Sequence, residues 1–294
     1  MQIFDKKIHL REYVCSPTGG YTCSSPKVNL YIYASGFCPA SCSFCPGFNE
    51  KTKIDIKKFQ IALSELHNKQ VINRIAITGG EPLLDLFSLD KILETIYNVC
   101  GNAYHISVNT NGVNLKHARN MEYFSLLNDI HISRHSDKDD LNDKIFGITT
   151  PTAKQIAEQI ALGPNIFSLS CNLLTDHIND EKRLKDYLYQ AIDIGVYQVG
   201  FVSLMEKTKL CKDLFVDYNS ITPKLFVKDG FLFETMFKDK ESCRCENFVY
   251  YNKNGKIPFY MRRAYGENTD CVKALIFNQN NNLITNFGKD SVLL

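Results

Sequence analysis

The segment KVNLYIYASGFCPASCSFCPG, residues 27–47, joins a β-strand pattern to a loop with three cysteines. Its first half is a run of β-branched and aromatic residues that stops at a Ser-Gly pair, as strands do where a turn begins. Its second half contains Cys38, Cys42 and Cys45, separated by three and two residues. Three thiols this close together cannot all pair with one another, so the loop predicts a function other than structural disulfides.

The same strand pattern recurs along the chain and alternates with helical patterns. Strands are predicted to begin near residues 27, 71, 104, 129, 165 and 197. Helical periodicity is found between them, over residues 55–69, 86–100, 115–123, 137–146, 152–162 and 178–195. Alternating strands and helices predict a parallel sheet with right-handed crossovers. Six such units predict an α/β fold of the partial (βα)6 TIM-type barrel kind, rather than a complete eight-unit barrel.

This alternation stops near residue 206. The later sequence contains VYYNKNGKIPFYMRR, residues 249–263, in which an Asn-Gly pair predicts a hairpin turn, and the hairpin-like ALIFNQNNNLITNF, residues 274–287. We therefore expect a small C-terminal β-hairpin-rich extension. The predicted organisation is an N-terminal segment, 1–26, the partial barrel, 27–206, and the extension, 207–294.

Composition narrows the class of protein. The 294 residues are 44% apolar and 22% charged, as in ordinary globular domains. No apolar run approaches the ~20 residues that cross a bilayer, and the first 15 residues show no secretory signal, so we expect no membrane association and a cytoplasmic location. The 34 basic and 32 acidic residues are spread along the chain and give no clear indication of nucleic-acid binding.

Eleven cysteines are many for a protein of a reducing compartment, and they favour metal or redox chemistry. Three cysteines on one loop can each ligate one iron of a [4Fe-4S] cluster and leave the fourth iron open. Zinc is the alternative, but a closed tetrahedral site needs a fourth ligand from a distant part of the chain. Unliganded thiols are the remaining interpretation.

Polar motifs follow several of the predicted strands. TGGEP, residues 78–82, follows the second strand, NTNG, residues 109–112, the third, and SRHS, residues 133–136, the fourth. In parallel α/β barrels the loops after the strands form the active site, so these motifs and the cysteine loop are predicted to converge. Taken alone, TGGEP fits a tight strand-to-helix turn equally well.

With CPASCSFC and TGGEP in this order on a (βα)6 pattern, the chain resembles the radical S-adenosylmethionine (SAM) superfamily over roughly residues 27–206. The resemblance implies a SAM-binding [4Fe-4S] cluster on the three loop cysteines and reductive cleavage of SAM to a 5'-deoxyadenosyl radical. It assigns the backbone of the TGGEP motif (Gly79, Gly80 and Glu81) to the SAM amino group and the backbone of Phe44 to the adenine edge. It assigns Asn111, Ser133 and Arg134 to the ribose and carboxylate of SAM. His135, beside the last two, is interpreted as structural.

A second group of cysteines follows the sixth strand and comprises Cys211, Cys243, Cys245 and Cys271. Four thiols are the number that closes a [4Fe-4S] cluster. Their placement resembles the twitch and SPASM extensions of radical SAM enzymes, which carry auxiliary clusters, although the C-x-C spacing is uncommon there. One auxiliary cluster is therefore expected, with buried unliganded thiols as the alternative. Cys100 and Cys171 are interpreted as core thiols, and Cys15 and Cys23 as free thiols.

The resemblance implies hydrogen abstraction from a peptide or a small polar metabolite, with reduced flavodoxin or ferredoxin as the electron donor. No catalytic residue is assigned. An iron-sulfur electron carrier or sensor is the alternative from another class, and it would have no need of the TGGEP motif. A zinc-binding interaction module is a third interpretation.

Overall fold

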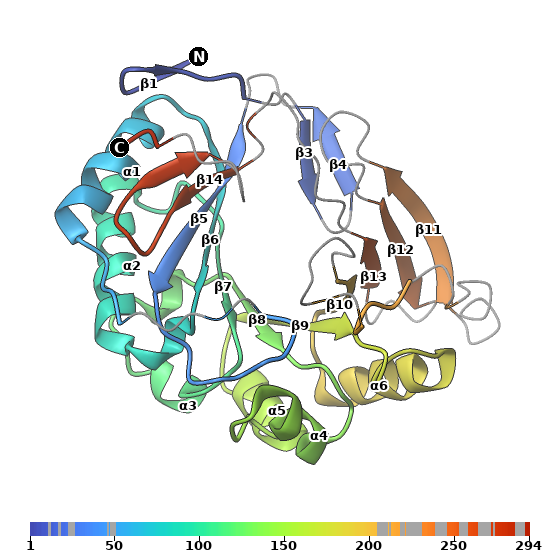
Figure 1. The fold of residues 1–294 in the computed structure, drawn as a ribbon. Coiled ribbons are helices and arrows are strands. Elements are labelled where there is room, and N and C mark those ends of the chain that lie inside the picture. Colours follow the sequence, from blue (N-terminus) through green and yellow to red (C-terminus); the bar gives the residue numbers. More distant parts are fainter. Residues whose placement is uncertain are drawn as a thin grey trace.

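The computed structural model contains one large mixed sheet with helices packed on its outer face (Figure 1). It describes residues 1–10, 13–16, 19–22, 27–45, 47, 51–204, 211, 213–217, 221, 231–238, 246–252, 258–263, 272, 274–285 and 292–294. The strand order in the large sheet is β11-β12-β13-β10-β9-β8-β7-β6-β5-β14-β15. Two further pairs, β1 with β2 and β3 with β4, are antiparallel.

The six predicted barrel strands are all present and lie side by side in sequence order. They are β5 (Val28–Ser35), β6 (Ile72–Gly79), β7 (Ile106–Thr110), β8 (Asp129–Ser133), β9 (Ile166–Leu173) and β10 (Gln198–Ser203). Each pairs in parallel with the next. The partial barrel predicted from the alternation of strands and helices is thereby confirmed.

The predicted helices are also present, with one exception in length. The helices are α1 (Ile56–Asn68), α2 (Leu86–Cys100), α3 (Leu115–Ala118), α4 (Asp139–Phe146), α5 (Ala153–Ala161) and α6 (Glu181–Ile194), with 3-10 turns η1 (Pro82–Leu84) and η2 (Phe124–Leu126). The helix predicted over residues 115–123 ends at Ala118, because the following residues turn back and bury Met121 and Phe124.

Two strands from the C-terminal part of the chain extend the parallel sheet at both of its edges. β13 (Pro258–Arg263) pairs with β10, and β14 (Ala274–Phe277) pairs with β5, both in parallel. In the described part of the chain, eight neighbouring strands therefore run parallel. Antiparallel strands β12 (Glu246–Asn252), β11 (Phe231–Lys238) and β15 (Leu283–Thr285) flank them, and β11 and β15 do not pair, so the barrel stays open.

Both predicted C-terminal hairpins are formed as antiparallel pairs, β12 with β13 and β14 with β15. The Asn254-Gly255 turn itself lies outside the described residues. The second hairpin is part of the main sheet, although its sequence predicted a place in an appendage. The division at residues 26 and 206 stays a prediction. The remaining N-terminal strands are β1 (Gln2–Ile3), β2 (Lys6–Lys7), β3 (Tyr13–Ser16) and β4 (Gly19–Thr22).

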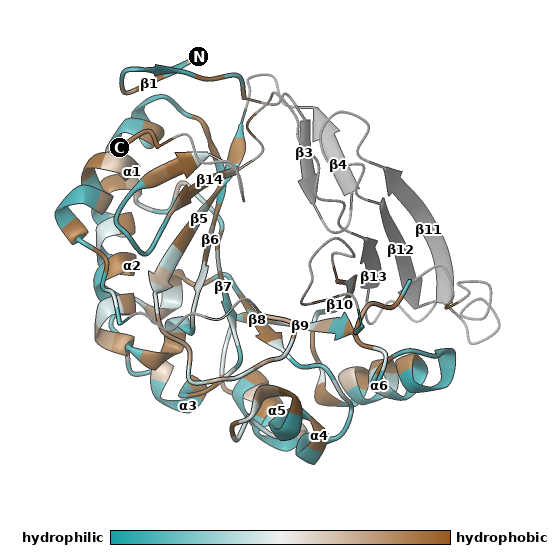
Figure 2. Ribbon diagram, in the orientation of Figure 1, coloured by the Kyte–Doolittle hydropathy of each residue, from teal (hydrophilic) through white to brown (hydrophobic). Residues whose placement is uncertain are grey.

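The apolar core lies between the strands and the helices. In each barrel strand, alternate residues such as Ile32, Ile77 and Val108 are fully buried in this core, and Figure 2 shows brown positions where the helices meet the sheet. The predicted core faces of α1 and α6 are buried as expected. The other residues of each strand face the interior of the open barrel, which leaves that face available for polar side chains. No helix among the described residues is both long and apolar enough to cross a bilayer.

Candidate functional site

The cysteine loop follows β5 at the carboxyl end of the sheet. A turn formed by Ser35 starts it, because the Ser35 hydroxyl accepts a hydrogen bond from Phe37 N (3.1 Å). Cys45 N donates to Cys42 O over 3.1 Å and curls the segment between these two cysteines. Cys38, Cys42 and Cys45 are all half-exposed and free of disulfides. The loop thus presents three available thiols.

The electrostatics of the loop thiols indicate what they can bind. Burial, reinforced by the neighbouring Cys45 and Cys38 thiols, raises the pKa of Cys42 to about 12. Burial likewise raises the pKa of Cys38, with Glu81 and Cys45 adding to the effect. Thiolates at this site therefore need a compensating positive charge, and metal binding supplies it while releasing the thiol protons.

The donor set suits a cluster better than a single metal ion. In the ranges that the structure describes, no three Cys, His, Asp or Glu side chains converge as ligands of one ion. A cubane cluster does not require its ligands to converge on one ion, because each thiolate binds a different iron. The three loop thiols thus fit a [4Fe-4S] cluster with one open iron, whereas they do not form a tetrahedral zinc site by themselves.

The TGGEP motif supports the cysteine loop through its backbone. Gly80 N donates to Ser35 O over 2.8 Å, and Glu81 N donates to Phe37 O over 2.9 Å. Gly79 has a φ of +114°, and a Cβ on Gly80 would lie 2.2 Å from Phe37 O. Glycine is therefore required at both positions, one for conformation and one for close approach.

Glu81 acts inside the protein rather than at its surface. Its carboxylate is 1% exposed and accepts hydrogen bonds from Thr110 Oγ1 (2.5 Å), Asn111 N (2.7 Å) and Leu83 N (2.9 Å). Burial nonetheless raises the pKa of Glu81 to about 7. The Glu81 side chain thus ties the end of β6 to the end of β7.

Asn111 connects this network to the first loop thiol. Its Oδ1 accepts from Val113 N (2.9 Å), which fixes the orientation of the amide, and its Nδ2 then donates to Cys38 Sγ over 3.8 Å. Asn111 is buried, in line with a structural position at the site. The structure therefore places Asn111 beside a predicted cluster ligand.

Ser133 and Arg134, predicted together as SAM contacts, point to opposite faces of β8. Ser133 belongs to the inner face of the barrel, whereas Arg134 is 2% exposed and lies toward the helices. The Arg134 guanidinium donates to Asp139 Oδ1 (2.7 Å) and Gln190 Oε1 (3.2 Å), while its Nε has no partner among the described residues. Its side chain therefore holds α4 and α6 together in this structure.

His135 is next to the cysteine loop, a position that the sequence interpretation did not anticipate. Its ring makes an edge contact with Phe44 (centroids 5.1 Å apart) and stacks on Phe146 (5.0 Å). Asn172 N donates to His135 Nδ1 over 3.0 Å, so Nε2 carries the proton of the neutral ring. Burial lowers the pKa of His135 to about 3. The sequence could have revealed this position, because side chains alternate along a strand and His135, two residues after Ser133, faces the same side.

Cys211, the first predicted ligand of an auxiliary cluster, contacts the same loop. It is buried with Leu174 and Leu204, and its thiol donates to Phe44 O over 3.7 Å. The Phe44 backbone, predicted to contact adenine, is therefore engaged by this thiol. Cys243, Cys245 and Cys271 lie outside the described residues, as does Cys23. Cys100 and Cys171 are buried core thiols, as predicted.

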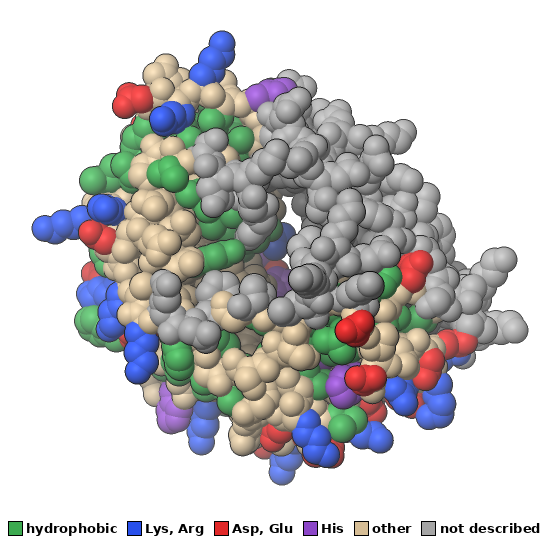
Figure 3. All heavy atoms as spheres, in the orientation of Figure 1, with side chains coloured by type: hydrophobic (Ala, Val, Ile, Leu, Met, Phe, Trp, Pro, Cys, Tyr) green, Lys and Arg blue, Asp and Glu red, His purple; other side chains and the backbone are tan. Residues whose placement is uncertain are grey.

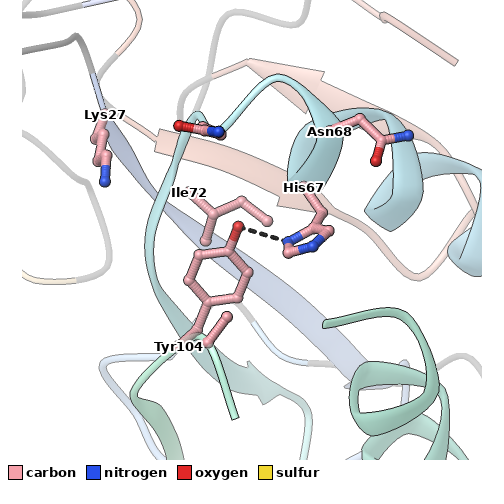
Figure 4. Close-up of a pocket in the computed structure, with 7 residues that line it drawn as sticks. Lys27, His67, Asn68, Ile72 and Tyr104 are labelled. Carbon is pink, nitrogen blue, oxygen red and sulfur yellow. Dashed lines mark hydrogen bonds between the residues drawn. The ribbon is translucent and has the colours of Figure 1, made fainter. Parts of the chain in front are cut away.

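A pocket of about 400 Å³ lies at the other end of the barrel (Figure 4). Lys27, His67, Ile72 and Tyr104 line it, and His67 Nδ1 is 2.9 Å from the Tyr104 hydroxyl. Lys27 and Tyr104 precede β5 and β7, Ile72 begins β6 and His67 lies in the last turn of α1, so the pocket is at the amino end of the strands, away from the thiols. We place the functional site at the cysteine loop, because reactive groups converge there and not in this pocket.

These features form a site suited to an iron-sulfur cluster on an open parallel barrel. Residues 26–143 match the family described as a 4Fe-4S single cluster domain. This match and the partial-barrel fold confirm the resemblance to the radical SAM superfamily. No curated protein matches the chain.

Solved structures with the same fold are distant in sequence. Streptococcus suis SuiB is 12% identical, with a TM-score of 0.60, over 87% of this chain and 59% of that one. SuiB bound to the precursor peptide SuiA is 16% identical, with a TM-score of 0.55, over 69% of this chain and 46% of that one. The chain thus spans about half the length of these proteins.

Proposed function

We propose that this protein is a radical SAM enzyme that abstracts hydrogen from a peptide or a small polar metabolite. The observation that carries the proposal is the loop of three free thiols whose backbone is held by the TGGEP motif. When bound, the cluster and SAM supply a 5'-deoxyadenosyl radical. The chain's own part is to hold the thiols, fix the loop and shape the barrel interior.

In this proposal Cys38, Cys42 and Cys45 hold the cluster, and Phe44, Gly79, Gly80, Asn111, Ser133 and Arg134 stay candidates for SAM contacts. For Glu81 we propose a supporting role, since its carboxylate already receives three hydrogen bonds. Arg134 would have to leave Asp139 to bind a carboxylate. His135 joins the candidates, because its Nε2–H is a fixed neutral donor beside Phe44.

For the substrate and the electron donor we propose only the chemical class. SuiB, which shares the fold, is seen with a precursor peptide bound, and this supports a peptide as one of the two substrate classes. Reduced flavodoxin or ferredoxin is the proposed electron donor. An auxiliary [4Fe-4S] cluster on Cys211, Cys243, Cys245 and Cys271 would assist oxidation or substrate binding.

The test is anaerobic reconstitution followed by iron counting and incubation with SAM and dithionite. About four irons and formation of 5'-deoxyadenosine support the enzyme with one cluster, and about eight irons support the auxiliary cluster as well. Cys38→Ala should abolish the product, whereas Cys100→Ala, a buried thiol away from the loop, should not. Iron without any 5'-deoxyadenosine would overturn the proposal in favour of an electron carrier or sensor.

A further inference from the structure

The inner face of the barrel carries a row of polar residues, one on each of its six strands. The row consists of Tyr33, Thr78, Asn109, His131, Ser168 and Gln198. Strand register places them abreast: Tyr33 opposite Thr78, Asn109 opposite His131, and Ser168 opposite both His131 and Gln198. Their neighbours along each strand belong to the apolar core under the helices, so the row itself faces the interior.

Three polar atoms in and beside this row are buried without a hydrogen-bond partner among the described residues. They are His131 Nε2, Ser168 Oγ and Asp129 Oδ1. Ser168 is 1% exposed, and Asp129 lies two residues before His131 on the same face of β8. Each buried polar atom left unpaired costs about 1–3 kcal/mol, so three together indicate a missing partner.

The ionisable groups in and beside the row do not hydrogen-bond directly to one another. His105 Nε2 lies 3.6 Å and His131 Nε2 lies 3.8 Å from Asp129 Oδ2. Both distances exceed a direct hydrogen bond, so Asp129 and the two histidine rings keep hydrogen-bonding capacity that they do not use on one another. Figure 3 shows the molecule hollowed at its centre, with histidine and basic side chains visible inside the hollow.

The charges around the space indicate what that partner is. Burial lowers the pKa of both His105 and His131 by more than the carboxylate of Asp129 raises it, and the positive charge of Arg74 adds to the lowering. When both histidine rings are neutral, the positive charge of Arg74 offsets the negative charge of Asp129. A charged ligand would upset this balance, whereas an uncharged group can donate to Asp129 and accept from Ser168 or His131.

We propose that Asp129, His131 and Ser168 form a recognition site for an uncharged polar group, a hydroxyl or a carboxamide, of the substrate. In naming a substrate the inference rests on the proposed function. From His131 to the carboxyl end of β8 the strand rises only two residues, roughly 7 Å. A substrate bound here by its polar end extends toward the cysteine loop.

The inference can be tested on the full-length, cluster-reconstituted protein without SAM. Histidine-selective isotope labelling reports on the His131 ring by NMR, with His131→Gln identifying its signals. Acetamide should shift these signals saturably, and acetate and methylammonium should not. Ser168→Ala and Asp129→Asn should each weaken acetamide binding by about tenfold, the loss of one hydrogen bond. Ser125→Ala, at an exposed position, should leave it unchanged.

Folding is controlled within the same set of variants. Since Ser168 Oγ has no partner among the described residues, Ser168→Ala should not lower the unfolding temperature. Absence of a saturable acetamide shift would show that only water fills the space and would overturn the inference. Equal shifts with the charged probes, or a Ser168→Ala variant that binds normally, would also overturn it. None of these outcomes depends on 5'-deoxyadenosine, so the proposed function is tested separately.

Discussion

Glu81 is the buried carboxyl group whose ionisation the fold controls most directly. Burial raises its pKa from 4.5 to about 7. The folded protein therefore keeps a proton that the unfolded chain has already lost between these two pH values. The contribution to stability is fully present below pH 4.5 and is lost as the pH rises through 7, and it amounts to roughly 3 kcal/mol.

We expect Glu81→Gln to remove this part of the pH dependence, because its amide does not ionise. Urea unfolding of the wild type and the variant from pH 4.5 to 7.5 should give free energies whose difference changes across this window. Glu158→Gln, at an exposed position, is the matched control and should follow the wild type. Parallel curves for Glu81→Gln and the wild type would show that Glu81 ionises normally in the fold.

Asn111 offers a second test at the residue scale. Its amide donates to Cys38 Sγ, and hydrogen bonds to cluster sulfurs raise the reduction potential. Asn111→Leu should therefore lower the midpoint potential of the reconstituted cluster, measured by redox titration followed by EPR. Asn73→Leu removes an amide that donates to Asn29 instead, away from the thiols, and should leave the potential unchanged. An unchanged potential in Asn111→Leu would rule out the hydrogen bond to the cluster ligand.

At the scale of elements, the close approach of β6 to the cysteine loop depends on the glycine at position 80. A methyl group on Gly80 would meet the Phe37 carbonyl at 2.2 Å, and backbone atoms cannot move aside as a flexible side chain can. We expect Gly80→Ala to cost at least about 1–3 kcal/mol and to lower iron retention after reconstitution. At Gly163 the nearest atom is the end of the Arg119 side chain, so Gly163→Ala should be milder on both measurements. Equal effects would argue against the backbone contact.

The sequence predicted the elements better than the roles of the residues at their ends. Hydrophobic periodicity placed all six barrel strands, and the helix predicted over residues 86–100 coincides with α2, which Asp85 caps in the structure. Periodicity cannot show which face of a strand end meets the site. Arg134 and His135 show this limit, since the predicted contact turns to the helices and the residue interpreted as structural packs on Phe44.

The pairing of strands that are distant in the sequence could not be predicted, for a related reason. The run ALIF of β14 is too short to reveal its partner, and only the fold shows that it lies beside β5, more than 200 residues earlier. Glu81 is similar, because two of its three donors, Thr110 and Asn111, lie 29 and 30 residues away at the end of the next strand, beyond any local spacing rule. Motifs could therefore be located from sequence, whereas the contacts that support them required the tertiary structure.

At the scale of the whole molecule, β14 makes the C-terminal part of the chain a component of the barrel. Phe277 on β14 is fully buried and packs edge-on against Phe59 of α1, with ring centroids 5.3 Å apart. The contact joins the last strands of the chain to the strand and helix on either side of the cysteine loop. Stability of the C-terminal residues and stability of the barrel should therefore be coupled.

Phe277→Ala should lower the free energy of unfolding by about 3–5 kcal/mol, because it leaves a cavity between β14 and α1. Phe87→Ala removes the same atoms from a side chain on α2 that is 73% exposed and should have little effect. Urea unfolding followed by far-UV circular dichroism should show a single transition moved to lower urea for Phe277→Ala. Two separate transitions, with the second at the wild-type position, would instead show that residues 207–294 unfold as the separate unit predicted from the sequence. A single shifted transition means that the strand carrying the cysteine loop depends on the end of the chain for its stability.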